Sequence, residues 1–302
     1  MPPLSLLLPC ALLLALAAAP TPTLASTATI DFTQPGAPFR RGFNGCVGSG
    51  HALLGLRSDW RQHLASARSD LGVEYIRFHG ILDDDMSVVR DDGSGYSFFN
   101  TDSVLDYIIS LGMLPVVELS FMPRSLAARP NETIFHYSGI TSPPADWQQF
   151  SDLIVAFVSH HVDRYGLATV QSWYYEVWNE PNCGFWTGTK QEYLHLYQVT
   201  VLAVKSVHKS LRVGGPATCQ VDWIPDLIAF AKSAVLPLDF ISTHLYPTDP
   251  NVPQVRARAR MRSNCCLRVH ASSVTLPPRT LRPDSPRRST KPPLKRRGSR
   301  CC

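Results

Sequence analysis

Short apolar runs alternate with longer amphipathic segments along the middle of the chain. The runs are rich in β-branched and aromatic residues, which is typical of strands in a sheet that is covered on both faces. They predict strands over residues 43–47, 73–79, 114–119, 173–179, 211–214 and 238–244. The pattern therefore predicts a sheet of several buried, parallel strands.

Helical periodicity fills the segments between these runs. Residues 146–165 and 190–209 carry apolar side chains at helical spacing, and the same pattern is weaker over 58–71, 101–111 and 222–235. The first of these helices is expected to stop at Gly166. The second follows Thr189 and Glu192, which have the spacing of a capping box.

Strand–helix alternation of this kind makes a parallel α/β sheet. Six strand–helix units fit before residue 250, whereas a closed (β/α)8 barrel needs eight and usually about 250 residues. We therefore expect residues 26–250 to form an α/β fold of the (β/α)8 TIM-barrel type that is incomplete, with about six strand–helix units.

The start of the chain differs from this body. Residues 6–19 form an apolar run that is too short to span a bilayer, and small residues follow it up to Ala25, as in a secretory signal peptide. We assign residues 1–25 to that signal. We expect secretion, or a lysosomal or vacuolar location reached through the secretory pathway, with no membrane attachment after the signal is removed.

Charge separates the C-terminal segment from the rest. Residues 1–250 carry a net charge of −8, whereas residues 251–302 carry +13, seven prolines and almost no periodic apolar pattern. The acidic body argues against a nucleic-acid partner. We interpret residues 251–302 as a disordered, basic, Pro/Arg-rich tail. It is either an arm that binds polyanions or an out-of-frame product, and we favour the second.

Three of the eight cysteines, Cys46, Cys183 and Cys219, lie in the body. Their spacing is not that of a zinc site or a disulfide-rich scaffold. One bridge and one thiol are compatible with this number, and the sequence does not decide the pairing. It indicates no oligomeric state either.

The strongest chemical signal lies at the end of the fourth predicted strand, in Trp173-Tyr-Tyr-Glu-Val-Trp-Asn-Glu-Pro-Asn182. A barrel places its catalytic groups at such strand ends, and strand alternation predicts that Glu176, Trp178 and Glu180 share one side. A carboxyl group that is poorly solvated between aromatic side chains retains its proton more readily, as a general acid in glycoside cleavage must. Glu180 is therefore the candidate acid, and Asn179 is placed to bind a sugar hydroxyl.

Six blocks of the body resemble glycoside hydrolase family 39, which contains the β-xylosidases and the α-L-iduronidases. Trp178-Asn-Glu-Pro-Asn182, with Phe185-Trp186 after it, looks like the family's acid/base strand. The other blocks occur in family order: Cys46-Val-Gly-Ser-Gly50, the stretch 75–86, Val117-Glu-Leu-Ser-Phe-Met-Pro123, Arg212-Val-Gly-Gly-Pro-Ala217 and Asp239-Phe-Ile-Ser-Thr-His-Leu-Tyr246. They are closer to the xylosidase branch than to the iduronidase branch.

This resemblance implies a retaining glycosidase on a (β/α)8 barrel, with Glu180 as the acid/base. It implies a carbohydrate substrate, either a xyloside or a uronide-containing glycan, and neither a cofactor nor a metal. The residues that it places around the sugar are His79, Asn179, His244 and Tyr246, with Phe121 and Phe185 as walls.

A retaining mechanism needs a second carboxylate, which the family supplies as a glutamate at the end of the seventh strand. No glutamate follows Glu192 in this sequence, and Asp249 is the poor remaining candidate. We assign no nucleophile and expect little or no hydrolase activity from the chain as written. The alternative is a non-catalytic carbohydrate-binding or misfolded fragment.

Four other polar groups of the body receive structural interpretations. We expect Arg77 to pair with Glu118 or Glu176 inside the sheet, and Glu192 to act only as a capping partner. His160 and His161 are interpreted as a solvated helix end rather than as metal ligands. The run Asp83-Asp-Asp85 could bind a cation, but we interpret it as solvated surface.

Overall fold

The computed structural model describes residue 33 and residues 45–90, 95–246 and 248–249. The predicted signal (1–25) and the predicted tail (251–302) lie outside the described residues. The chain divides into two compact units, and all the elements below belong to the unit of residues 41–302.

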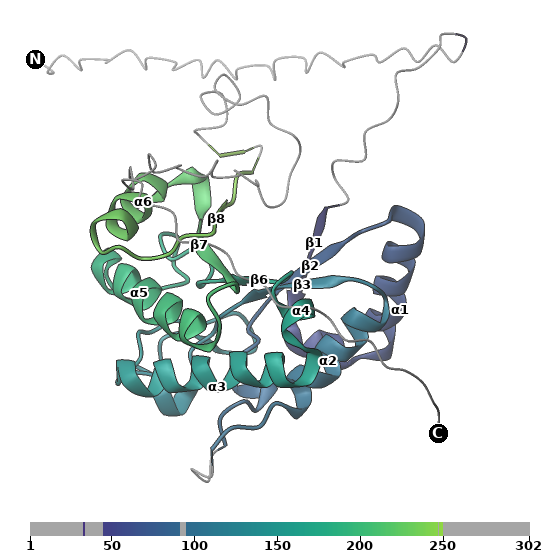
Figure 1. Ribbon diagram of the computed structural model, residues 1–302, viewed down its shortest axis with the longest axis horizontal. Coiled ribbons are helices and arrows are strands. Elements are labelled where there is room, and N and C mark those ends of the chain that lie inside the picture. Colours follow the sequence, from purple (N-terminus) through teal and green to yellow (C-terminus); the bar gives the residue numbers. More distant parts are fainter. Residues whose placement is uncertain (1–32, 34–44, 91–94, 247, 250–302) are drawn as a thin grey trace, which may run out of the picture. The chain divides into compact units, whose positions relative to one another are not determined.

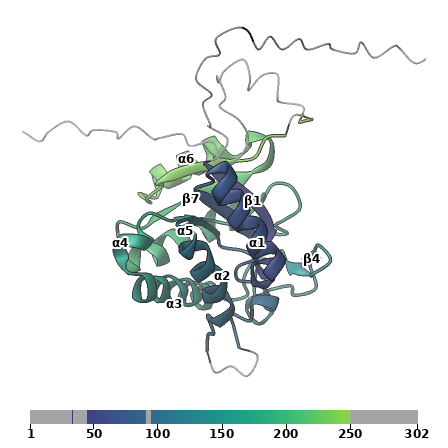
Figure 2. The ribbon, with the colours of Figure 1, turned by 90° about the vertical axis from the view of Figure 1, so that its right-hand side faces the viewer.

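A six-stranded, wholly parallel sheet forms the centre of this unit, in the order β1-β2-β3-β6-β7-β8. Its strands are β1 (Cys46–His51), β2 (Tyr75–His79), β3 (Leu114–Glu118), β6 (Tyr174–Glu176), β7 (Arg212–Thr218) and β8 (Phe240–Thr243). Figure 1 shows the strands curling into part of a barrel with the helices outside, and Figure 2 gives the side view. The expected incomplete TIM-barrel fold with six parallel strands is confirmed.

Six helices cover the outside of the sheet: α1 (Ser58–Ser66), α2 (Phe99–Ser110), α3 (Trp147–Tyr165), α4 (Leu167–Val170), α5 (Lys190–Val207) and α6 (Ile224–Ser233). α3 and α5 pack directly against each other. None of the helices in the described part of the chain is long and apolar enough to span a membrane.

The two longest helices begin and end within two residues of the predicted bounds. Asp146 caps α3 by accepting the backbone N–H groups of Gln148 and Gln149, and the helix stops where Gly166 takes a φ of +77°. Thr189 and Glu192 form the capping box of α5, so the structural interpretation of Glu192 is confirmed.

Successive side chains along each strand point alternately to the inside of the curved sheet and to the side covered by helices. On β2, Arg77 reaches across the inside of the curved sheet to Glu176 of β6, so its neighbours Ile76 and Phe78 pack on the helix side, where both are fully buried. On β6, Tyr175 correspondingly contacts His161 of α3. The inner face therefore collects charge, and the outer face collects apolar contact area.

A small hairpin that the sequence pattern did not indicate lies between β3 and α3. It pairs β4 (Thr133–Ile134) with β5 (Gly139–Ile140) in antiparallel fashion. The segment between its strands carries Phe135 and Tyr137 toward the carboxyl ends of the sheet strands, where both contact other rings.

Candidate active site

Four polar residues discussed from the sequence, His79, Glu118, Glu176 and His244, gather at the carboxyl ends of the strands, and His51, which the sequence did not single out, joins them. His51, His79, Glu118 and Glu176 are the last residues of β1, β2, β3 and β6, and His244 follows β8 directly. Parallel strands place their carboxyl ends on one rim of a barrel, which is where barrel enzymes carry their active sites.

Arg77 is the centre of a buried ionic network below this rim. Its guanidinium lies 2.6 Å from Glu176 Oε2, 2.7 Å from Glu118 Oε2 and 2.9 Å from the side-chain oxygen of Asn179. The arginine side chain is only 10% exposed, and both glutamates are fully buried. The expected structural pairing of Arg77 is confirmed with both carboxylates, and the network also fixes the orientation of the Asn179 amide.

Glu118 links this network to the rim. Burial by itself would raise the pKa of Glu118, but the charges of Arg77 and His79 and hydrogen bonds from His79 and Ser120 outweigh burial and lower the pKa to about 2. Glu118 is thus an anion that holds His79 Nδ1 at 2.7 Å. The second ring nitrogen of His79 stays available to a ligand, since the side chain is 24% exposed.

Glu180 lies just beyond the end of β6, where the chain leaves the extended conformation. Trp178 and Glu180 both have positive φ, at 68° and 39°, and the Glu180 N–H donates to Ala217 O at 2.9 Å. The carboxylate is 13% exposed, and its Oε1 lies 2.7 Å from His244 Nδ1. The structure therefore joins Glu180 to His244, two residues that the resemblance had placed in one site.

The change of backbone conformation alters the side-chain order predicted by alternation. Trp178 is fully buried between Phe121 and Trp186, and its indole N–H donates to Phe185 O at 2.6 Å. Asn179, rather than Trp178, joins Glu176 at Arg77. The prediction of one shared side for Glu176, Trp178 and Glu180 is wrong, because strand alternation ends at β6.

A disulfide braces this irregular segment. Cys183 and Cys219 are bonded, and Cys46 lies outside the bridge. Next to the bridge, the Asn182 side chain both donates to Cys219 O and accepts the Cys219 N–H, at 3.1 and 3.0 Å. The loop that carries Glu180 is therefore tied to the end of β7 by covalent and polar contacts.

Aromatic rings surround His79. Its ring centroid lies 6.1 to 6.4 Å from those of Phe121, Phe135 and Phe185. Phe121 is fully buried, Phe185 is half-buried, and Phe135 is 44% exposed. Sequence reasoning missed Phe135, because a short aromatic loop without periodicity carries no signal beyond its composition.

Tyr246 is placed differently from the other candidates. It lies two residues after His244, its side chain is mostly exposed, and its backbone N–H donates to Asp249 Oδ2 at 2.7 Å. The structure thus puts Tyr246 at the outer edge of the rim, beyond the Glu180–His244 pair.

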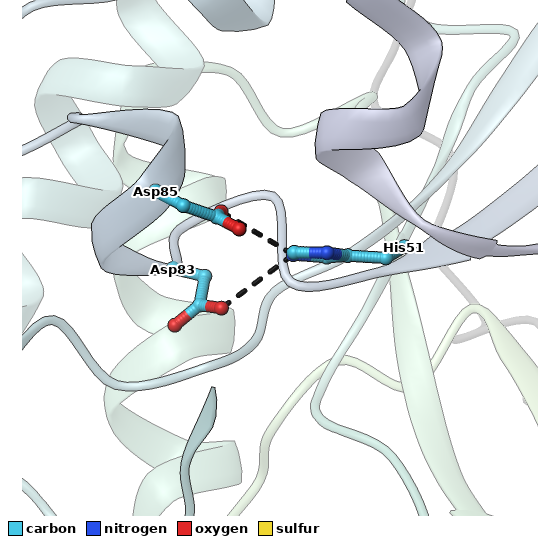
Figure 3. A group of neighbouring side chains, drawn as sticks. All are labelled: His51, Asp83 and Asp85. Atoms are coloured by element: carbon cyan, nitrogen blue, oxygen red, sulfur yellow. Dashed lines mark ion pairs between the residues drawn. The ribbon is translucent and has the colours of Figure 1, made fainter. Parts of the chain in front are cut away.

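Asp83 and Asp85 form a second polar cluster, with His51 at the end of β1 (Figure 3). The solvated-surface interpretation is wrong for Asp83, which is buried where the chain turns back over the end of β1. Burial disfavours a charged His51, but the two carboxylates outweigh it and raise the pKa of His51 to about 9. The ring of Tyr137 stacks on His51 at 3.7 Å.

The interpretation of His160 and His161 as a solvated helix end is wrong in part. His160 contacts Asp102 at 2.7 Å near the surface, but His161 is fully buried between α3 and the sheet, where its Nδ1 lies 3.0 Å from the Tyr175 hydroxyl. Burial, with a smaller effect of His160, lowers the pKa of His161 to about 3, so it is a neutral core residue.

Known proteins resemble both the sequence and this fold. A sequence model described as glycosyl hydrolases family 39 matches residues 27–265. A β-xylosidase of Caldicellulosiruptor saccharolyticus is 48% identical over 226 residues, which are 71% of this chain and 46% of that protein. A β-xylosidase of Geobacillus stearothermophilus is 42% identical over 218 residues, covering 69% and 43%.

The solved structures agree. The structure of a family 39 β-xylosidase from Caulobacter crescentus matches with a TM-score of 0.68 and 37% identity, over 74% of this chain and 51% of that one. The chain spans about half the length of the curated relatives it matches.

Proposed function

Because the chain belongs to glycosyl hydrolase family 39, we propose that the rim carries the sugar-binding and proton-donating part of a retaining β-xylosidase site. The observation that carries the proposal is the pair of Glu180 and His244, held at 2.7 Å at the end of β6 and still open to solvent. A carboxyl group in this position protonates the glycosidic oxygen as the bond breaks, and its carboxylate later takes a proton from water.

The neighbours of Glu180 provide contacts for a sugar ring. Arg77 donates a hydrogen bond to the side-chain oxygen of Asn179. This bond orients the amide so that its NH2 group can donate to a sugar hydroxyl. His79 offers its second ring nitrogen, and the exposed parts of Phe135 and Phe185 offer apolar surface for the sugar face. We further propose that Tyr246 contacts the sugar or its leaving group from the outer edge.

A neutral pentose fits these residues better than a uronic acid. The carboxylate of a uronide needs a cationic partner, and the Arg77 guanidinium is already paired with Glu118 and Glu176. The high identity to two β-xylosidases supports the same choice. We therefore propose a xyloside as the ligand, with a uronide-containing glycan as the alternative.

The second carboxylate of the mechanism has no counterpart that we can assign. It must lie about 5–5.5 Å from the acid/base. Glu118 and Glu176 are committed to Arg77, and no glutamate follows Glu192 in the sequence. We propose that the chain as printed binds the sugar with little or no turnover. A carbohydrate-binding protein without catalysis is the second candidate function.

The test combines binding and turnover on the full chain. Titration with xylose and xylobiose should quench the fluorescence of Trp178 and Trp186, which lie next to Phe185 and Phe121. Release of phenol from aryl β-xylosides measures turnover. Where turnover is seen, Glu180→Gln should lower kcat/KM by about 10²–10⁴-fold, and more for a poor leaving group than for an activated one.

Glu192→Gln is the matched control, because glutamine also serves in a capping box and Glu192 lies in the first turn of α5. It should change neither binding nor turnover. Full activity in Glu180→Gln would contradict the acid/base role, and wild-type turnover at ordinary enzyme rates would contradict the low activity proposed here.

We also propose that the protein enters the secretory pathway. The bridge between Cys183 and Cys219 is of the kind that persists in oxidising compartments, and Asn131 of the sequon Asn131-Glu-Thr133 is exposed. Expression in a eukaryotic host, followed by enzymatic removal of N-glycans, should reduce the apparent mass. An unchanged mass and a cytosolic product would contradict the proposal.

A further inference from the structure

His51, Asp83 and Asp85 converge on one point beside the rim (Figure 3). His51 comes from the end of β1, and the two aspartates come from the turn after β2, at the 3₁₀ segment Asp84–Met86. Their ligand atoms lie within 4.8 Å of one another. Among the residues that the structure describes, no other group of three His, Cys, Asp or Glu side chains brings its ligand atoms so close together.

One polar atom of each side chain is buried without a direct hydrogen bond. The side chains of His51 and Asp83 are only 8% and 2% exposed. Within the described structure, no hydrogen bond reaches His51 Nε2, Asp83 Oδ2 or Asp85 Oδ1, although all three atoms are shielded from solvent. Buried polar atoms are normally satisfied, so three of them facing one another indicate a missing partner at their centre.

The nitrogen–oxygen distances in this cluster are longer than those in three other histidine–carboxylate pairs of the described structure. Nitrogen and oxygen are 2.7 Å apart in the pairs His79–Glu118, His160–Asp102 and His244–Glu180. In the cluster, His51 Nε2 lies 3.5 Å from Asp83 and 3.3 Å from Asp85. A tetrahedral ion with bonds of about 2.0–2.1 Å holds its ligand atoms roughly 3.3 Å apart.

We propose that His51, Asp83 and Asp85 bind a divalent transition-metal ion, with Zn²⁺ as the best fit and solvent as the fourth ligand. One imidazole and two carboxylates suit zinc better than calcium or magnesium, which prefer all-oxygen sites. Two carboxylates and a neutral imidazole carry −2, so a divalent cation makes the buried group neutral. The ion would tie the end of β1 to the turn after β2, apart from the groups proposed to act on sugar.

Gly80 leaves the room that this arrangement needs. Its φ is +71°, and a Cβ at this position would lie 3.0 and 3.1 Å from Cδ2 and Nε2 of the His51 ring. A larger residue would push the imidazole away from the aspartates. The stacked ring of Tyr137 covers one face of the imidazole, so His51 is held with its edge toward the carboxylates.

The test measures metal uptake by the full chain. Cysteines elsewhere in the sequence also bind zinc, so accessible thiols are first alkylated with iodoacetamide, and metals are removed with EDTA. Co²⁺ is then added as a spectroscopic probe. We expect one equivalent with visible d–d bands and no thiolate charge-transfer band, displacement of Co²⁺ by Zn²⁺, and a higher unfolding midpoint with either ion.

Asp85→Asn and Asp84→Asn form a matched pair of variants. Asp85 is the most exposed member of the cluster, so its substitution disturbs the fold least. Asp84 lies between the two ligands but faces outward, where it accepts the Arg124 N–H at 2.8 Å. Asp85→Asn should weaken Co²⁺ binding at least about tenfold, and Asp84→Asn should leave it unchanged.

Two results would overturn the proposal. Thiol-blocked wild-type protein that takes up no Co²⁺ would show that the cluster is a metal-free triad of one imidazolium and two carboxylates. Uptake that is equal in Asp85→Asn and wild type would place the metal elsewhere. Because the first result needs only the wild-type chain, the test does not depend on the folding of any variant.

Discussion

The two faces of strand β6 bury polar groups in opposite ways. On the inner face, Glu176 is a charged partner of Arg77, which also holds Glu118. On the outer face, Tyr175 meets His161 of α3, and burial keeps both uncharged, since it raises the pKa of the tyrosine and lowers that of the histidine. Adjacent residues of one strand therefore lie in an ionic region and in a neutral one.

This difference separates polar groups that serve a site from those that serve the core. A buried ion pair often adds nothing to stability compared with well-packed apolar residues, whereas a broken one is costly. The inner network is thus poor evidence for stabilisation and better evidence that Asn179 and His79 must be held in place. The outer pair fills space and shares one hydrogen bond, and the other ring nitrogen of His161, Nε2, is buried without a hydrogen-bond partner in the described structure.

Arg77→Met should have the largest effect on stability. It leaves Glu176 without its cation and Glu118 with only His79, and the loss of one partner of a buried pair costs about 3–5 kcal/mol. Urea unfolding of the full chain measures the difference. Arg57→Met is the control, because Arg57 pairs with Asp59 on the exposed surface, where little or no change in stability is expected. Equal effects of the two substitutions would remove the distinction between the faces.

In mildly acidic solution, just below pH 6.5, the pH dependence of stability should come mainly from His161 on the outer face. The pKa of His161 falls from 6.5 to about 3 on folding, so below pH 6.5 the unfolded chain binds a proton that the folded chain does not. Stability contributed by this group is complete above pH 6.5 and falls by about 1.4 kcal/mol per pH unit as the pH decreases.

His161→Gln removes the titrating group and should flatten this part of the profile. Unfolding of wild type and variant is compared from about pH 6.5 to about pH 5, the upper part of the window in which the histidine of the unfolded chain titrates. Parallel profiles in this range would show that His161 is not kept neutral by the fold.

The sequence predicted the framework of the molecule because the framework depends on repeated, local signals. Apolar runs identified five of the six sheet strands, and the first run, 43–47, overlaps β1 only at Cys46 and Val47. Helical spacing, with the capping box at Thr189 and the stop at Gly166, identified the two longest helices. Glu180 was indicated by its place at a strand end, but its neighbour at the rim, His244, came from the family resemblance. Spacing alone does not bring together groups that are 64 positions apart.

Features that depend on long-range packing were not predictable in this way. The backbone turn at Trp178 and Glu180 ends strand alternation, and no residue type there demands a positive φ. Asp83 was interpreted as solvated, because a run of three acids usually is. Its burial depends on where His51 lies after β1 and β2 pair in the sheet.

Tyr175→Phe should have the smallest effect, and it isolates a single hydrogen bond of the outer face. The substitution keeps the ring and removes only the hydroxyl that contacts His161 Nδ1 at 3.0 Å. The histidine nitrogen is then buried without this partner, which costs about 1–2 kcal/mol. The loss should stay well below that of Arg77→Met, because a neutral group left unpaired is cheaper to bury than a charge. Urea unfolding at neutral pH gives the value, and a loss as large as that of Arg77→Met would mean that the outer pair is charged after all.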